Sequence, residues 1–200
     1  QELIKMIRES GIMFTELEPE SVDMPFGTMS GAGMIFGVTG GVTEAVLRKI
    51  AADNSRTTLA QITYTGVRGM DSVKEADIPF GDKVLKIAVV SGLGNAEGLL
   101  KKIKAGETHY DLVEVMACPG GCIDGGGQPL HHGNGDIIKA RWEAIYQADK
   151  EMPIRKSHEN PSIQTLYKEF LGEPCGHKSH ELLHTHYFDR QTTVEVDLNK

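Results

Sequence analysis

The chain has 200 residues, of which 40% are hydrophobic and 24% are charged, an ordinary composition for a globular protein with a buried core. Its formal net charge of −7 disfavours nucleic acid as a partner, because binding to phosphates needs a surplus of Lys and Arg. No apolar run approaches the roughly 18 residues that a membrane-spanning helix needs, and no signal-peptide pattern stands at the start.

The first predicted element is an amphipathic helix at residues 2–10, which Gly11 would end. The chain starts at Gln1 and enters this pattern at once, which we interpret as a cut from a longer chain. Residues 18–41 are long and apolar for a loop, which favours a buried or functional segment. A second helix is predicted at residues 42–53, with an acidic residue in its first turn and basic residues later.

The middle of the chain predicts a sheet. Residues 62–68 alternate as a strand. Residues 84–92 read as a buried strand, residues 95–105 as a helix, and residues 110–116 as a second buried strand. A strand–helix–strand unit of this length implies a parallel pair with a right-handed crossover. We therefore predict an α/β fold with a mostly parallel sheet flanked by helices.

The last part of the chain predicts three further helices. The first covers residues 135–150 and contains the only tryptophan. The second has Asn160 as its cap and Pro161 as its first position, and it extends to about Leu171. The third, at residues 177–188, contains four histidines.

The most informative stretch is 114–129, EVMACPGGCIDGGGQP, which we call the cysteine loop region. Cys118 and Cys122 stand four apart among glycines, just past the end of the second buried strand. Ligands bind beyond the carboxyl ends of parallel strands, and thiolates favour iron–sulfur clusters or zinc. Three cysteines do not make a disulfide framework, so we expect a cytoplasmic protein, with the periplasm as the alternative.

Other interpretations of these cysteines stay open at this point. They could be buried structural thiols, or they could bind zinc together with His131 or His132. A cubane cluster normally takes four cysteines, and the third cysteine, Cys175, is isolated in a turn and expected to be a free thiol. The site is therefore either incomplete or completed by protein outside this sequence.

Two further motifs are weaker. The glycines of residues 31–41 lack the strand–turn–helix context and the acidic residue of a dinucleotide fingerprint. Residues 180–184 read HELLH, the pattern of zinc proteases, with His180 and His184 as ligands and Glu181 as base. The extended forms of that pattern are missing, which favours surface histidines on a C-terminal helix.

Three stretches resemble the C-terminal portion of the catalytic subunit of iron-only hydrogenases. Residues 30–48, SGAGMIFGVTGGVTEAVLR, resemble the glycine-rich segment that packs against the family's active-site cluster. Residues 114–129 resemble its last cluster-binding signature, and residues 155–187 resemble its C-terminal helical end. The resemblance implies that residues 1–200 form one lobe of a two-lobed catalytic domain, the C-terminal lobe of the H-cluster domain.

The resemblance implies particular roles for five residues. The family's H-cluster is a 4Fe-4S cubane joined through one cysteine to a two-iron unit carrying CO, cyanide and a dithiolate. By position, Cys118 would ligate the cubane, and Cys122 would bridge it to the two-iron unit. Met116 would pack beside that unit, and Phe36 and Gly37 would line its pocket. Cys122 and Met116 are thus the expected catalytic positions.

The implied activity is the reversible oxidation of H2 to protons and electrons, with electrons exchanged with ferredoxin or, through partner subunits, with NAD(P). Two upstream signatures of the family, which supply the other cubane cysteines and a proton-transfer cysteine, are not in this sequence, so the isolated chain is expected to be inactive. Thr43 stands where a methionine is common in the family. The alternative is a non-catalytic iron–sulfur assembly or scaffold protein that shares the cysteine loop.

Overall fold

The computed structural model describes residues 1–21, 23–24, 27, 29–54 and 67–186, and of these the side chains of residues 51–54 are left aside. The chain divides into two units, residues 1–160 and residues 161–200. The expectation of a single lobe over residues 1–200 stays a prediction.

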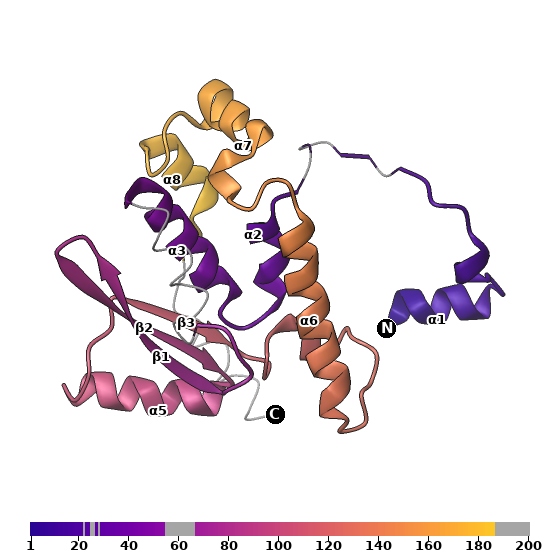
Figure 1. The fold of residues 1–200 in the computed structure, drawn as a ribbon, viewed down its shortest axis with the longest axis horizontal. Helices are drawn as coiled ribbons and strands as arrows, with labels where there is room; N and C mark the ends of the chain where they lie inside the picture. The colour runs from indigo at the N-terminus through magenta and orange to yellow at the C-terminus, as the bar shows by residue number, and fades with distance from the viewer. Residues whose placement is uncertain (22, 25–26, 28, 55–66, 187–200) are drawn as a thin grey trace, which may run out of the picture. The chain divides into compact units, whose positions relative to one another are not determined.

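The first unit contains a three-stranded sheet (Figure 1). Its strands are β1 (Val73–Phe80), β2 (Lys83–Ser91) and β3 (Leu112–Met116), in the order β1-β2-β3. Strand β2 pairs with β3 in parallel and with β1 in antiparallel fashion. The predicted α/β fold with helices flanking the sheet is confirmed, and the sheet is mixed because its β1 edge is antiparallel.

Strand β1 was not predicted from the sequence. It forms a tight hairpin with β2 through Gly81 and Asp82, and Gly81 adopts a positive φ of +58°. Pro79 argues against a strand, but β1 is an edge strand, where a residue without an N–H is tolerated. The strand predicted at residues 62–68 falls mainly on residues 62–66, outside the described residues, and residues 67–68 are not in a strand.

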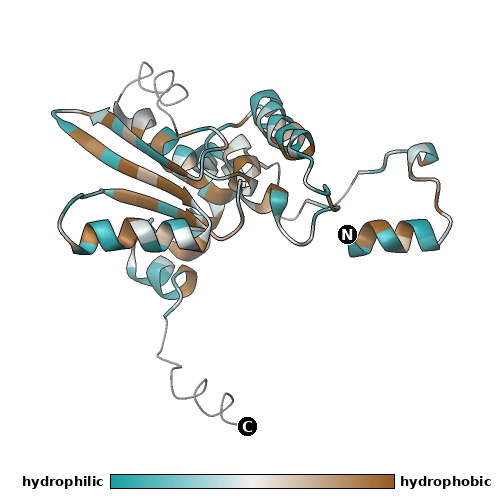
Figure 2. Ribbon diagram, turned by 90° about the horizontal axis from the view of Figure 1, so that it is seen from below, coloured by the Kyte–Doolittle hydropathy of each residue, from teal (hydrophilic) through white to brown (hydrophobic). Residues whose placement is uncertain are grey.

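The predicted strand–helix–strand unit is confirmed as β2, α5 (Leu93–Lys104) and β3. Alternate residues of β2 enter two separate cores, because successive side chains of a strand point to opposite faces. Ile87 and Val89 pack in one core with Leu47 of α3 (Gly41–Asn54). Ala88 and Val90 pack in the other with two residues of α5, Ala96 and Leu99. Figure 2 shows the resulting run of hydrophobic residues along the central strand.

A third core lies beside the sheet, between the glycine-rich segment and a long helix. Within the long segment 18–41, residues 31–37 fold as α2 (Gly31–Met34) and a 3-10 turn, η2 (Ile35–Gly37). The segment is mostly buried from Ser30 onward, whereas the described residues among 18–29 form no helix and are exposed. Helix α2 and turn η2 pack with α6 (Gly135–Glu151) and the 3-10 turn η3 (Cys122–Asp124). The buried side chains of this third core are Ile35, Val38, Ile123, Ile138 and Tyr146.

The remaining elements of the first unit are short. Helix α1 (Glu2–Glu9) and turn η1 (Phe14–Glu16) bury none of their residues, and Gly11 follows α1 with a φ of +67°. Turn η4 (Ser157–Glu159) closes the unit. Helix α1 therefore agrees with the sequence prediction to within one residue at its end.

The second unit contains α7 (Pro161–Leu166), a π-helical turn η5 (Tyr167–Leu171) and α8 (His177–Leu183). The helix predicted to end at Leu171 does end there, and Gly172 follows with a φ of +83°. Helix α8 is shorter than predicted, because it ends at Leu183 rather than at residue 188, although residues 187 and 188 lie outside the description. Within the described residues, no helix has the length and apolar character to cross a membrane.

Gly41 is a point where the fold admits no side chain, and it generates a test. A Cβ at Gly41 would lie 1.7 Å from the carbonyl oxygen of Ile35, whereas a Cβ at Gly98 in α5 meets nothing within 4 Å. We predict that Gly41→Ala lowers the free energy of unfolding by about 1–3 kcal/mol, as overpacking does. Gly98→Ala should raise it by about 0.5–1 kcal/mol, because alanine favours a helix interior.

Both free energies can be measured by denaturant unfolding of the apoprotein followed by circular dichroism. Equal effects of the two substitutions would contradict the close approach of α3 to η2.

Candidate metal centre at the cysteine loop

Cys118 and Cys122 are both free thiols, one half-buried and the other exposed. Cys118 lies two residues past the end of β3, and Cys122 opens turn η3. Between them Gly120 and Gly121 have φ values of +77° and +101°, which side chains rarely adopt. The N–H of Gly121 donates to the carbonyl of Cys118, at 3.0 Å, so the loop between the two cysteines is a tight turn.

The cysteine loop is in backbone contact with the glycine-rich segment. The Thr39 N–H donates to the carbonyl of Gly120 at 3.0 Å. A Cβ at Gly121 would lie 2.8 Å from the carbonyl oxygen of Gly37 and 2.8 Å from the nitrogen of Thr39. Such a close approach is open only to glycine. The structure therefore brings together Gly37 and the loop of the two cysteines, which the sequence placed eighty residues apart.

Phe36, expected to line the pocket with Gly37, and Met116, expected to pack beside the two-iron unit, are both next to these segments in the chain. Phe36 directly precedes Gly37, and its side chain is 46% exposed. Met116 ends β3, two residues before Cys118, and is half-buried. Among the described residues, neither side chain belongs to a core cluster.

A buried carboxylate on β3 joins the loop to helix α3. Glu114 is 8% exposed, and its Oε1 accepts from the Gly40 N–H at 2.7 Å. Its Oε2 accepts from the N–H and the hydroxyl of Thr43, at 2.8 and 2.6 Å. A negative charge that binds the free N–H groups of a helix N-terminus stabilises that end. Sequence reasoning missed Glu114, because it reads as one residue of an apolar strand.

A buried lysine lies under the same turn. Lys74 of β1 is 7% exposed, and its Nζ donates to the carbonyls of Thr39 and Gly69, at 3.3 and 3.0 Å. Burial lowers the pKa of Lys74, and the nearby charges of Glu114 and Asp71 act in the opposite direction. Lys74 was also missed, because β1 itself was not predicted.

A second set of buried charges links helix α3 with helix α6. Arg48 donates to Glu44 at 2.7 Å and to both oxygens of Asp149 at 2.7 Å, and all three side chains are at most 3% exposed. Arg68 donates to both oxygens of Glu44, and Arg155 donates to Asp149. The sequence showed Glu44 and Arg48 only as charges matched to a helix dipole.

The pKa shifts follow these contacts. Burial alone would raise the pKa of Asp149, but hydrogen bonds from Arg48 and Arg155 hold it below its usual value. Burial alone would lower the pKa of Arg48, but Asp149 and Glu44 raise it. Asp149 and Arg48 are therefore both charged across the neutral range.

The histidines that the sequence singled out belong to no metal-binding group among the described residues. The ring nitrogens of His180 and His184 face each other across one turn of α8, both exposed, as surface histidines would. His131 lies 3.0 Å from a carboxylate oxygen of Asp124. Among the described residues, no group of three or more His, Cys, Asp and Glu side chains is arranged to hold a metal ion. Cys175 is exposed, in the second unit.

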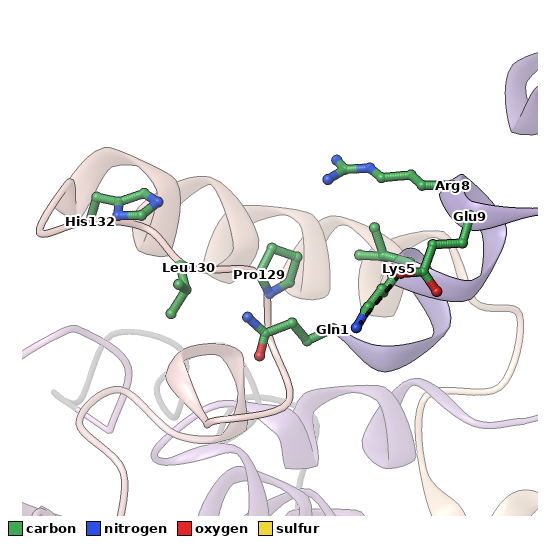
Figure 3. Close-up of a pocket in the computed structure, with 8 residues that line it drawn as sticks. Gln1, Lys5, Arg8, Glu9, Pro129, Leu130 and His132 are labelled. Atoms are coloured by element: carbon green, nitrogen blue, oxygen red, sulfur yellow. Dashed lines mark ion pairs between the residues drawn. The ribbon is translucent and has the colours of Figure 1, made fainter. Parts of the chain in front are cut away.

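One large cavity borders the end of the cysteine loop region (Figure 3). Its volume is about 620 Å³, and it lies between α1 and the residues that follow the loop glycines. Lys5, Arg8 and His132 are among its lining residues, and Lys5 is ion-paired with Glu9. Neither cysteine is among its lining residues.

Two family models match the chain. The model described as "Iron only hydrogenase large subunit, C-terminal domain" matches residues 1–126. The model described as "Iron hydrogenase small subunit" matches residues 135–190. The first match includes the glycine-rich segment and both cysteines of the loop.

Individual relatives agree with these matches. NADP-reducing hydrogenase subunit HndD of Solidesulfovibrio fructosivorans is 52% identical over 96% of this chain and 32% of its own length. Cytosolic iron-sulfur assembly component 3 of Mus musculus is 32% identical over 93% of this chain and 39% of its own length. A solved structure of a variant of [FeFe]-hydrogenase HydA1 from Chlamydomonas reinhardtii has a TM-score of 0.67 at 39% identity, over 92% of this chain and 53% of that one. The chain thus spans about a third of the hydrogenase relative's length and about half of the solved structure.

The buried ionic network beside the site generates a test. We predict that Asp149→Asn lowers the free energy of unfolding by about 3–5 kcal/mol, because Arg48 would keep its charge without a full set of partners. Glu97→Gln in α5 removes one partner of an exposed ion pair and should change the free energy of unfolding by no more than about 0.5 kcal/mol.

The same network predicts a pH dependence. Because the pKa of Asp149 is lowered, its contribution is present above the ordinary carboxyl pKa of 3.8 and is lost as the pH falls below it. Urea unfolding at pH 7 and at a series of acid pH values measures both effects. An acid profile of Asp149→Asn that parallels the unmodified protein would contradict the assignment.

Proposed function

We propose that this chain, which belongs to the family of the C-terminal domain of iron-only hydrogenase large subunits, forms the part of a hydrogenase that holds the H-cluster through Cys118 and Cys122. The reaction is the reversible oxidation of H2 to two protons and two electrons. The observation that carries the proposal is the turn that presents these two thiols, held in backbone contact with the Gly37–Thr39 segment.

The residues present fit the thiolate side of an iron–sulfur centre. Both sulfurs are free, and thiolate is the ligand that such clusters require. A Cβ at Gly125 would lie 3.9 Å from the Cys118 sulfur, and Gly126 and Gly127 have nothing within 4 Å. The glycine run therefore leaves room beside the sulfur for a bulky inorganic group. Two thiolates fit half of a cubane's usual set, and the described residues offer no third one nearby in the first unit.

When bound, the H-cluster supplies the redox chemistry that splits or forms H2. The chain's own residues would bind and shield it. Cys118 and Cys122 would hold the iron through their thiolates, the tight turn between them would keep the two cysteines close together, and the backbone of Gly37 would support the turn at Gly121. Phe36 and Met116 are apolar and near the loop, so they would exclude water from a bound group.

The electron partners belong to the proposal as well. One relative is named an NADP-reducing hydrogenase subunit, and this supports electron exchange with NAD(P) through partner subunits. Ferredoxin is the other electron partner that we propose. Two free thiols in the first unit suit a reducing compartment, so we place the protein in the cytoplasm.

A second function has a specific observation in its favour. The cytosolic iron–sulfur assembly relative is 32% identical over 93% of the chain, so a non-catalytic assembly or scaffold role would use the same cysteine loop. The higher identity of 52% to a hydrogenase subunit supports the catalytic role. The two roles differ in H2 turnover, because an assembly protein would bind the cluster and evolve no H2.

The first prediction concerns the thiols. We predict that, in protein purified anaerobically with its cluster, Cys118 and Cys122 resist alkylation while exposed Cys175 reacts. Removal of iron by a chelator should make Cys118 and Cys122 reactive as well. Mass spectrometry of peptides after iodoacetamide treatment measures this. Protection of Cys175, or free reaction of Cys122 in the iron-loaded protein, would contradict the ligand assignment.

The second prediction concerns activity. Cys122→Ala in the complete enzyme should abolish H2 evolution, because the methyl side chain of alanine cannot replace the sulfur ligand. Cys175→Ala is the matched control and should retain activity, since this thiol is exposed in the second unit. Gas chromatography of H2 with reduced methyl viologen measures both. Retained H2 evolution by Cys122→Ala would refute the proposal, and a cluster without H2 turnover in the unmodified protein would favour the assembly role.

A further inference from the structure

One peptide group, between Thr39 and Gly40, is held at both ends by buried side chains of opposite charge. Its carbonyl accepts from Lys74 Nζ at 3.3 Å, and its N–H donates to Glu114 Oε1 at 2.7 Å. The two side chains come from β1 and β3 and are 7% and 8% exposed. We call this arrangement the peptide clamp.

The peptide clamp is joined to the cysteine loop by a closed ring of contacts. The chain runs from Glu114 through Cys118 to Gly120, whose carbonyl accepts from the Thr39 N–H at 3.0 Å. The next peptide, Thr39–Gly40, returns to Glu114 through its own N–H. Because the ring is short and contains hydrogen bonds to a buried charge, the loop cannot shift relative to residues 37–40 without breaking one of them.

The charges exceed what the fold alone requires. Helix α3 could be capped by a neutral side chain, and a buried lysine is held here with its pKa lowered by burial. Charged hydrogen bonds are stronger and more directional than neutral ones, so they define the position of the bound peptide more narrowly. A narrowly defined position is useful where the Gly37–Thr39 segment and the cysteine loop must keep a fixed separation.

We propose that Glu114 and Lys74 are positioning residues that fix the Cys118–Cys122 loop against the Gly37–Thr39 wall for cluster binding. This inference rests on the proposed function, since it assigns the clamp to the same site. Glu114 and Lys74 act through the peptide between them and are not ligands of the cluster.

The variants are Glu114→Gln and Lys74→Met, each of which removes a charge and keeps most of the side chain. Thr43→Val is the mildest probe, because it removes only the hydroxyl that donates to Glu114. The matched controls are Glu97→Gln and Lys101→Met, which break an exposed ion pair of α5.

The first readout uses the apoprotein of the complete chain. We expect the alkylation rate of Cys118, relative to that of Cys175, to rise about tenfold in Glu114→Gln and in Lys74→Met, which corresponds to a loop opening about 1.4 kcal/mol easier. The double variant should react no faster than the faster single one, because both side chains hold one peptide. Thr43→Val should give a smaller rise, and the controls should give none.

The second readout uses the iron-loaded protein. We expect the electron paramagnetic resonance signal and the reduction potential of the cluster to shift in the two clamp variants and to stay unchanged in the controls. A purely structural role would lower the melting temperature while leaving the Cys118-to-Cys175 ratio and the resonance signal unchanged, and this outcome overturns the proposal.

The two hypotheses fail separately. If the unmodified protein binds no iron–sulfur cluster, the proposed function fails, while the apoprotein alkylation still decides whether the clamp positions the loop. If Glu114→Gln does not fold, Lys74→Met and Thr43→Val decide the matter. Reactivity of Cys118 unaltered in both of these folded variants overturns the proposal.

Discussion

The hydrogen bonds that the carboxylate of Glu114 accepts are the interaction on which the rest of the site depends. The carboxylate accepts three hydrogen bonds, from the N–H of Gly40 and from the N–H and hydroxyl of Thr43, across more than seventy residues of sequence. These bonds fix the start of α3 to the end of β3. Strand β3 continues directly into the cysteine loop, which is also bonded to the glycine-rich segment between Thr39 and Gly120.

Glycines make the contact feasible. Side chains at Gly41 or Gly121 would collide with the backbone of the neighbouring segment, at 1.7 and 2.8 Å. Gly31 has the same role under α2, where a Cβ would lie 2.2 Å from a carboxylate oxygen of Asp149. Asp149 is itself held by Arg48 of α3, so the glycine-rich segment is packed between two sets of buried charges. Backbone approach and buried charge together define a rigid wall for the loop.

The sheet carries this arrangement because its central strand is buried on both faces. The alternation of β2 sends Ile87 and Val89 toward α3, and Ala88 and Val90 toward α5. A strand buried on both faces cannot slip by one residue without exchanging its two cores. The register of β2 with β3 pairs Ser91 with Met116, the last residue of β3, and therefore sets where the cysteine loop begins.

The sequence by itself determined the strand–helix–strand unit, most helix ends, the family resemblance and the position of the two cysteines just past a parallel strand. Periodicity and glycine stops act locally, so they are legible in one chain. It did not determine strand β1, whose Pro79 argues against a strand and is tolerated at the edge of the sheet that the described residues form. Only the tertiary structure decided the roles of Glu114, Lys74 and the Arg48–Asp149 pair. Their partners are distant in sequence, and a buried charge looks like any other charge until folding brings its counterpart to it.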